Sequence, residues 1–133
     1  MAQSVVSWRG IAFEDLCIRH MPQIKSALGI SGVITSQSNW IVPSNEDESG
    51  MQIDLLINRN DNVVNMCEMK FYNEDFVVSG DFYKKIASRV NKIHEKLPKK
   101  YAVHSTLITT YGLAYNEYSG AFQQVITLEN LFS

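Results

Sequence analysis

The sequence predicts an α/β fold in which a mixed sheet lies between helices. Apolar residues recur at helical spacing in two segments, and five shorter segments have the apolar and β-branched content of strands. These segments follow one another in the order α-β-β-β-α-β-β. The chain has 133 residues, of which 45% are hydrophobic and 20% charged, so we expect one domain with a substantial core.

The first helix is expected from about Trp8 to Leu28. Six apolar residues fall on one side of it at helical spacing, namely Phe13, Leu16, Cys17, Ile24, Ala27 and Leu28. Gly29 is a stop signal, and Pro22 requires a kink or an early break. The segment from Ile30 to Val42 indicates strand, with polar Thr35–Asn39 as an internal turn or hairpin tip, and acidic Pro43–Gly50 is expected to be a loop.

A β-hairpin is predicted next. Met51–Asn58 and Val63–Tyr72 are rich in apolar residues and are separated by the turn-forming segment Arg59–Asn62. A second helix is expected to begin at an N-cap, Asp81, and to end before Pro98. Its core-facing stripe consists of Phe82, Ile86, Val90, Ile93 and Leu97.

The last third of the chain is expected to supply two more strands. Val103–Thr110 is rich in β-branched residues, and Phe122–Thr127 is a shorter strand that leads into a helical turn, Leu128–Phe132. Tyr111–Gly120, between the strands, is a loop with three tyrosines that either stack on bases or simply pack. These elements complete a mixed sheet flanked by helices.

Charge and composition restrict the classes of protein. The net charge is −2 and the pI about 5.9, so any nucleic-acid site must be a local basic patch or borrow affinity from another domain. No apolar run approaches the roughly 20 residues that span a bilayer, and Met1–Ser7 does not resemble a secretory signal. We therefore expect a cytoplasmic protein without membrane contact. Cys17 and Cys67 are expected to be buried thiols, with a disulfide as the alternative.

The predicted hairpin carries three polar side chains that are candidates for a functional site. Glu68 and Lys70 are two residues apart on a strand, so their side chains leave the same face. If the loop is the three residues Asn60–Asn62, Asp54 lies directly opposite Glu68 with β-carbons about 5 Å apart. A loop of two or four residues would instead put the two carboxylates on opposite faces.

Two carboxylates that close repel each other unless one is protonated or a cation lies between them. Mg²⁺ takes oxygen ligands and commonly uses one or two carboxylates together with phosphate and water. Lys70 beside them could hold a phosphate oxygen or orient the attacking water. Glu-x-Lys alone is common on strands, so the prediction rests on its combination with an acidic residue in the preceding strand.

This combination resembles the PD-(D/E)xK phosphodiesterase superfamily, whose restriction-endonuclease-like core has the same α-β-β-β-α-β succession. Glu68-Met69-Lys70 matches its third-strand motif, whereas Ile53-Asp54 replaces the usual Pro-Asp. The resemblance implies a metal-dependent nuclease in which Asp54 and Glu68 hold Mg²⁺ or Mn²⁺, with the Met69 carbonyl as a further ligand. It implies that Lys70 stabilises the negative charge that develops at phosphorus during cleavage. Glu14 stands where an acidic residue of the first helix often binds the metal through water; the alternative is a solvated carboxylate.

A second resemblance covers nearly the whole chain. It is similar to the nuclease-like domain of unknown function at the C-terminus of bacterial and archaeal P-loop ATPases. The segments that carry it are Gly10-x-x-Phe13-Glu14-x-x-Cys17, Ile24-Lys25-x-Ala27-Leu28-Gly29-Ile30, Gly50-Met51-Gln52-Ile53-Asp54-Leu55-Leu56-Ile57, Cys67-Glu68-Met69-Lys70-Phe71 and Val125-Ile126-Thr127-Leu128-Glu129-x-Leu131-Phe132. The sequence has no Gly-x-x-x-x-Gly-Lys-Ser/Thr motif. We therefore expect residues 1–133 to be a single nuclease-like domain, the isolated C-terminal domain of a larger ATPase.

A basic stripe lies on the second helix. Lys85, Arg89, Lys92 and Lys96 are spaced by four, three and four residues, opposite the apolar stripe, and form either a phosphate contact or a solvated face. Gln52 shares the face of Asp54, where it binds phosphate or water or packs on the strand.

The sequence thus leads to two hypotheses. The first is a metal-dependent nuclease, or a nuclease-derived DNA-processing domain of a P-loop ATPase. The alternative is a non-catalytic nuclease-fold module that binds DNA or its ATPase partner. The intact Asp54, Glu68 and Lys70 favour the enzyme, and the acidic balance favours the module. A homodimer is compatible with either hypothesis.

Overall fold

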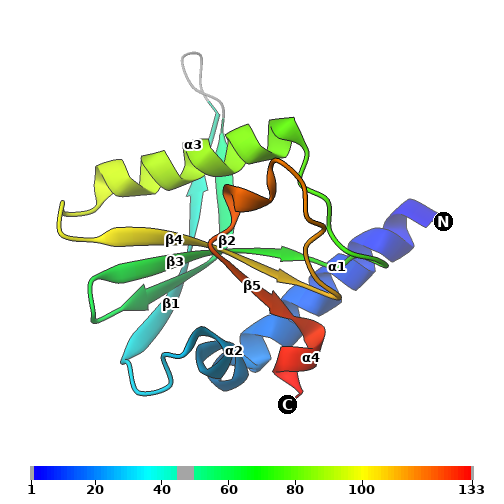
Figure 1. Ribbon diagram of the computed structural model, residues 1–133, viewed down its shortest axis with the longest axis horizontal. Coiled ribbons are helices and arrows are strands. Elements are labelled where there is room, and N and C mark those ends of the chain that lie inside the picture. Colours follow the sequence, from blue (N-terminus) through cyan, green and yellow to red (C-terminus); the bar gives the residue numbers. More distant parts are fainter. Residues whose placement is uncertain (1, 45–49, 133) are drawn as a thin grey trace.

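The structure of the protein, a computed structural model, describes residues 2–44 and 50–132. It is an α/β domain whose five-stranded mixed sheet has the order β1-β2-β3-β4-β5 and is flanked by helices (Figure 1). This confirms the predicted fold class. In chain order the elements are α1 (Ala2–Arg19), α2 (Met21–Leu28), β1 (Thr35–Val42), β2 (Met51–Arg59), β3 (Val63–Lys70), α3 (Gly80–Lys96), β4 (Ala102–Thr109), η1 (Ser119–Ala121), β5 (Gln124–Thr127) and α4 (Leu128–Leu131).

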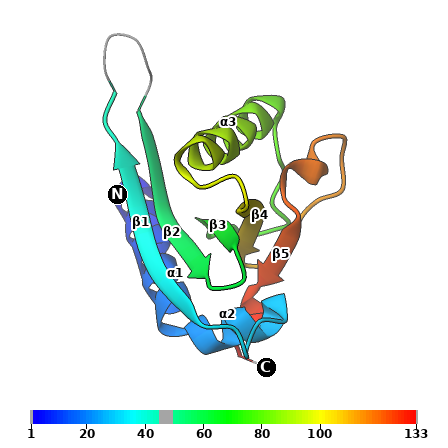
Figure 2. The same ribbon diagram turned by 90° about the vertical axis from the view of Figure 1, so that its left-hand side faces the viewer.

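The sheet has an antiparallel half and a parallel half. β1 pairs with β2 and β2 with β3 in antiparallel fashion, whereas β3–β4 and β4–β5 are parallel. Parallel neighbours need a crossover connection, and α3 provides it between β3 and β4. The β1–β2 hairpin extends beyond the rest of the sheet and rises beside α3 (Figure 2).

The core has two layers, one on each face of the sheet. On one face α3 packs through Ile86 and Ile93 against side chains of β2, β3 and β4. On the other face Phe13 and Cys17 of α1 pack with α2, α4 and the alternate side chains of the same strands. The side chains of β3 therefore alternate, with Val64 and Met66 toward α3 and Cys67 and Met69 toward α1. Both cysteines are buried, with free thiols, as predicted.

The first helix breaks where the sequence allows it. α1 ends at Arg19 and α2 begins at Met21, so Pro22 occupies the first turn of the new helix, where its missing N–H is tolerated. Gly29 then ends α2 with φ of 74°, a left-handed conformation that glycine adopts without steric cost. The break and the stop confirm the prediction.

Two local predictions are wrong. Thr35–Asn39 is not a turn but the first part of β1, an edge strand that is largely exposed, so its polar residues meet water rather than a core. The N-cap of α3 is Ser79, not Asp81, because the Ser79 hydroxyl accepts the Phe82 N–H. Asp81 lies instead in the first turn, where its charge favours the helix dipole. Residues 45–49 of the expected acidic loop lie outside the described residues. In the described segments no helix is long and apolar enough to cross a membrane.

Candidate functional site

The β2–β3 hairpin has the register that a three-residue loop predicts. Residues 60–62 connect the strands, and Asn62 closes the turn with φ of 65°. Leu55 pairs with Cys67 and Asn58 with Val64, which is the predicted alignment. The paired residues end at Leu55 and Cys67, one step before Asp54 and Glu68.

A β-bulge in β2 changes how Asp54 is presented. Ser38 of β1 pairs with Leu56 and Trp40 with Ile53, so two residues of β2, Asp54 and Leu55, oppose a single residue of β1. The bulge reverses the alternation of side chains, because Ile53 and Leu56 both pack on the α3 side. Asp54 is therefore exposed and turned away from α3. The predicted direct opposition of Asp54 and Glu68 on one face is wrong for this reason.

Glu14 of α1 meets Asp54 where β2 leaves β3. The pKa of Glu14 is raised by partial burial, by repulsion from Asp54 and by a hydrogen bond between the two carboxyl groups. Lys70 opposes this shift and Glu68 adds to it, so all four side chains lie within electrostatic reach. Gln52 donates its Nε2 to Asp54 Oδ1 at 2.8 Å. Glu14 is thus part of the acidic cluster rather than an isolated solvated carboxylate.

Glu68 has a cationic partner that was not expected. It is buried on the α3 side of β3, where its carboxylate forms an ion pair with Arg89 of α3. The side chains of Glu68 and Arg89 are 11% and 18% exposed. Burial raises the pKa of Glu68, while Arg89 and then Lys70 lower it and Asp54 raises it further. Glu68 therefore lies near the Glu14–Asp54 pair, but its ion pair is with Arg89 of α3, on the face of the sheet opposite to α1.

Lys70 lies at the end of β3, on the same side as Glu68. Its Nζ is 5.4 Å from the centre of the Phe82 ring, the distance of a cation–π contact. The Lys70 charge lowers the pKa values of both Glu14 and Glu68. It is thus placed to meet an anion that approaches the carboxylates.

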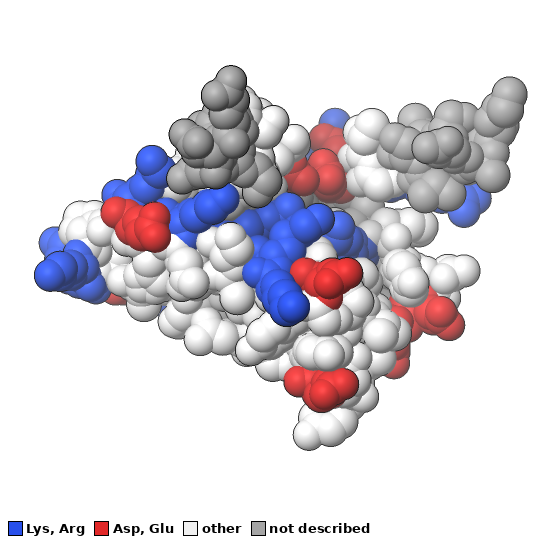
Figure 3. Space-filling view, turned by 90° about the horizontal axis from the view of Figure 1, so that it is seen from above, with Lys and Arg blue, Asp and Glu red and all other residues white. Residues whose placement is uncertain are grey.

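The predicted basic stripe divides into two parts. Lys85 and Lys96 are exposed and Lys92 is partly exposed, and Lys and Arg gather along α3 in the space-filling view (Figure 3). Arg89 departs from the prediction of an exposed stripe because it turns inward to Glu68. The position of Arg89 next to Val90, at the edge of the apolar stripe, was the signal that could have suggested this.

Carboxylate oxygens are the ligands that Mg²⁺ and Mn²⁺ take in proteins, and a lysine is a partner for a phosphate oxygen. Asp54 and Glu14 offer adjacent oxygens, and Glu68 can join them if it exchanges Arg89 for the cation. Within residues 2–44 and 50–132, no three His, Cys, Asp or Glu side chains already form a group that could hold a metal ion. The side-chain chemistry fits Mg²⁺ or Mn²⁺, and the arrangement of Glu68 must change for all three carboxylates to ligate it.

The repulsion in this cluster predicts that Glu14→Gln stabilises the protein near neutral pH. A carboxyl whose pKa is raised by folding favours the folded state below its ordinary pKa and opposes it once it ionises. Because Glu14 is partly exposed, we expect less than about 1 kcal/mol, or about 2–4 °C in Tm. The gain should vanish near pH 4.

Thermal unfolding of Glu14→Gln from pH 4 to pH 8 measures this gain. The control is Asp15→Asn, which removes an exposed carboxylate that pairs with Arg19 at 2.9 Å. That variant should be neutral or slightly destabilised at pH 7. If the Tm of the two variants changes with pH in the same way, repulsion from Asp54 does not raise the pKa of Glu14.

The fold and the site together define an α/β domain with acidic groups and a lysine where two strands of a mixed sheet separate. Among solved structures, that of a protein of unknown function designated AF1548 is similar, with a TM-score of 0.53 and 19% sequence identity. The match covers 84% of this chain and 61% of AF1548, so the chain spans less than two-thirds of that protein. At this identity the similarity shows the fold alone. No family model matches the chain, and no curated protein matches it either.

Proposed function

We propose that this domain is a metal-dependent phosphodiesterase of the PD-(D/E)xK type, acting on nucleic acid. The observation that supports this most is the contact between the Glu14 and Asp54 carboxyl groups, with Glu68 and Lys70 beside them. Like charges held together oppose folding unless a proton or a cation neutralises them. Groups that oppose folding in this way are typical of sites shaped by function.

Each side chain has a distinct role in this proposal. Asp54 and Glu68 bind Mg²⁺ or Mn²⁺, and Glu14 binds it directly or through water. When bound, the cation neutralises charge at the scissile phosphate and lowers the pKa of a water molecule. Lys70 donates to a phosphate oxygen on which charge develops. Gln52 holds Asp54 in place through its amide.

Thermal stabilisation by the metal tests the proposed site. A cation at about 100 times its dissociation constant stabilises the folded state by about 2.7 kcal/mol, which is several degrees in Tm at this size. We expect Mg²⁺ or Mn²⁺ to raise the Tm of the wild type and to have little effect on Asp54→Ala. Asp15→Asn is the control, because this exposed carboxylate should leave the metal effect unchanged. Equal shifts for Asp54→Ala and Asp15→Asn would contradict the metal site.

A second candidate function is a non-catalytic module of the same fold that binds DNA or a P-loop ATPase partner. The ion pair between Glu68 and Arg89 favours it, because this pair neutralises a carboxylate that catalysis would need for the metal. The net charge of −2 also favours it. This candidate would be favoured if the protein binds nucleic acid but does not cleave it, and if Mg²⁺ and Mn²⁺ do not raise its Tm.

A further inference from the structure

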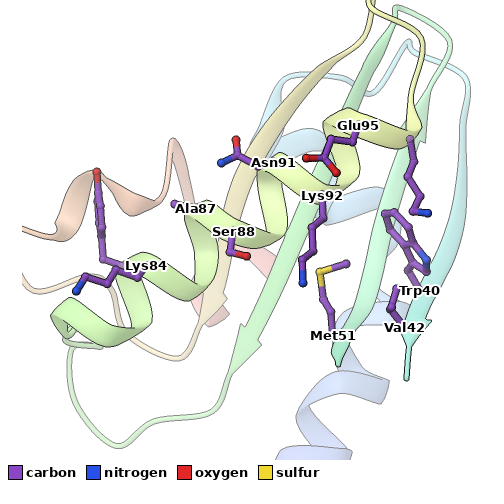
Figure 4. Close-up of a pocket in the computed structure, with 11 residues that line it drawn as sticks. Trp40, Val42, Met51, Lys84, Ala87, Ser88, Asn91, Lys92 and Glu95 are labelled. Atoms are coloured by element: carbon purple, nitrogen blue, oxygen red, sulfur yellow. The ribbon is translucent and has the colours of Figure 1, made fainter. Parts of the chain in front are cut away.

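A basic groove runs along α3, between this helix and the β1–β2 hairpin. One part of it is a hollow of about 560 Å³, with Trp40, Val42 and Met51 on the strand side and Lys84, Lys92 and Lys96 among the residues on the helix side. In Figure 4 the Lys92 side chain extends from α3 toward Met51, and Trp40 stands on the neighbouring strand. The figure thus shows two walls that belong to different layers of the fold.

The groove continues toward the candidate site. An adjoining hollow of about 550 Å³ is also lined by Met51, Lys84 and Lys92, and it adds Lys85 and Arg89. Because the two hollows share these residues, they form one surface along α3. Arg89 lines this surface and pairs with Glu68, so the groove reaches one of the candidate carboxylates.

The charge of the groove is opposite to that of the chain. Five cationic side chains and two acidic ones line it in the part of the chain that the structure describes, whereas the whole chain has a net charge of −2. The cations are Lys84, Lys85, Arg89, Lys92 and Lys96, and the acids are Asp81 and Glu95. A local excess of this kind attracts polyanions.

The strand side of the groove adds an apolar and aromatic surface. Trp40 is partly exposed there, and Lys96 Nζ lies 5.9 Å from the centre of its ring. An aromatic ring beside a track of lysines suits a ligand that carries both flat apolar rings and negative charge. Single-stranded nucleic acid is such a ligand, since its bases stack on aromatic side chains while a basic groove follows its backbone. A duplex keeps its base faces covered and cannot use Trp40 in this way.

We propose that this groove binds single-stranded nucleic acid, with a base stacked on Trp40 and phosphates on Lys84 and Lys92. The proposal rests on the proposed function and deepens it by naming a single strand as the substrate class. A phosphate at the Arg89 end of the groove would compete with Glu68 for the guanidinium. Substrate binding would then free Glu68 for the metal.

Binding of labelled oligothymidylate, about a dozen nucleotides long, tests the groove by fluorescence anisotropy. The measurement is made in EDTA, so neither metal nor cleavage affects it. We expect Trp40→Leu to weaken binding about tenfold, because base stacking on one aromatic residue is lost. Phe132→Leu is the control, since Phe132 is an exposed aromatic residue, 65% accessible, that does not line the groove. Equal affinities for these two variants would overturn the assignment of Trp40.

The lysines are tested by the salt dependence of the same binding. Each phosphate contact in a single strand contributes about −0.7 to the slope of log K against log salt. The double variant Lys84→Gln, Lys92→Gln should therefore bind more weakly and have a slope shallower by about 1.4. Its control is Lys99→Gln, Lys100→Gln, which makes the same charge change outside the groove. An equal change of slope in both double variants would refute the proposal that the phosphates contact Lys84 and Lys92 in particular.

Fluorescence of Trp40 gives a readout that does not require its removal. The chain has two tryptophans, so Trp8→Phe leaves Trp40 as the only reporter. We expect oligothymidylate to quench this fluorescence strongly and a blunt duplex of equal length to quench it little. Equal quenching or tighter binding by the duplex would overturn the preference for single strands. If binding depends on Trp40 but Mg²⁺ and Mn²⁺ do not raise the Tm, the nucleic-acid groove is supported and only the phosphodiesterase proposal is refuted.

Discussion

Replacement of Lys70 by alanine is expected to lower the rate of nucleic-acid cleavage by about 10²–10³-fold, the usual loss when one donor to a developing anion is removed. Lys70 extends from the end of β3 beside Glu68, and its ammonium makes a cation–π contact with the Phe82 ring. Affinity for nucleic acid should change little, because several other basic side chains line the α3 groove.

Two measurements separate these effects. Single-turnover cleavage with Mg²⁺ or Mn²⁺ gives the rate, and anisotropy in EDTA gives the affinity. Lys84→Ala is the matched control, because it removes a lysine of the groove and should weaken binding while saturating protein restores the rate. Glu68→Gln should lose metal binding and cleavage together. Equal cleavage by the wild type and Lys70→Ala would refute the role of Lys70, and no cleavage by the wild type on DNA or RNA would favour the non-catalytic module.

Replacement of Arg89 by methionine is expected to destabilise the protein by about 3 kcal/mol near neutral pH, because it leaves a buried carboxylate without its cation. Burial already raises the pKa of Glu68, and Arg89 is the largest influence that lowers it. Without Arg89 the pKa of Glu68 rises further. Ionisation of such a group opposes folding, so the loss should grow as the pH rises through the pKa and should shrink toward pH 4.

Urea unfolding of Arg89→Met across this pH range measures the loss. Arg19→Met is the matched control, because its ion pair with Asp15 has side chains that are 75% and 58% exposed, and an exposed pair contributes less than about 1 kcal/mol. The double variant Glu68→Gln, Arg89→Met should recover much of the stability, since it removes the buried charge as well. If Arg89→Met costs no more than Arg19→Met at pH 7, Glu68 is not a buried charge.

The parts of the site that depend on short-range rules could be predicted from the sequence. A three-residue loop, one of the three lengths that the sequence left open, predicts the register of the β2–β3 hairpin, and the pairing of Leu55 with Cys67 confirms that length. The two faces of β3 follow from strict alternation. The resemblance also singled out Glu14, which lies beside Asp54 in the fold although the two are far apart in the sequence.

The parts that depend on a third element could not be predicted. The bulge at Asp54 depends on the pairing of β2 with β1, whose register shifts between Ser38 and Trp40. The polar first half of β1 was predicted to be a turn, so this pairing could not be foreseen. An edge strand exposed to water needs no alternating pattern, so its sequence does not distinguish it from a loop. The inward turn of Arg89 depends on α3 lying over Glu68, which no spacing within the helix specifies.

From the division of the sheet into two halves we expect an order of assembly. β1, β2 and β3 are near neighbours in the chain, so they can pair while little loop entropy is lost. The parallel pairing of β3 with β4 must wait for the crossover through α3, because its contacts are more distant in sequence. In a growing or refolding chain, Asp54 and Glu68 are therefore brought near each other first. We expect the docking of α3 to come later and to bring Arg89 to Glu68, so that this carboxylate gains its cation in the same step that buries it.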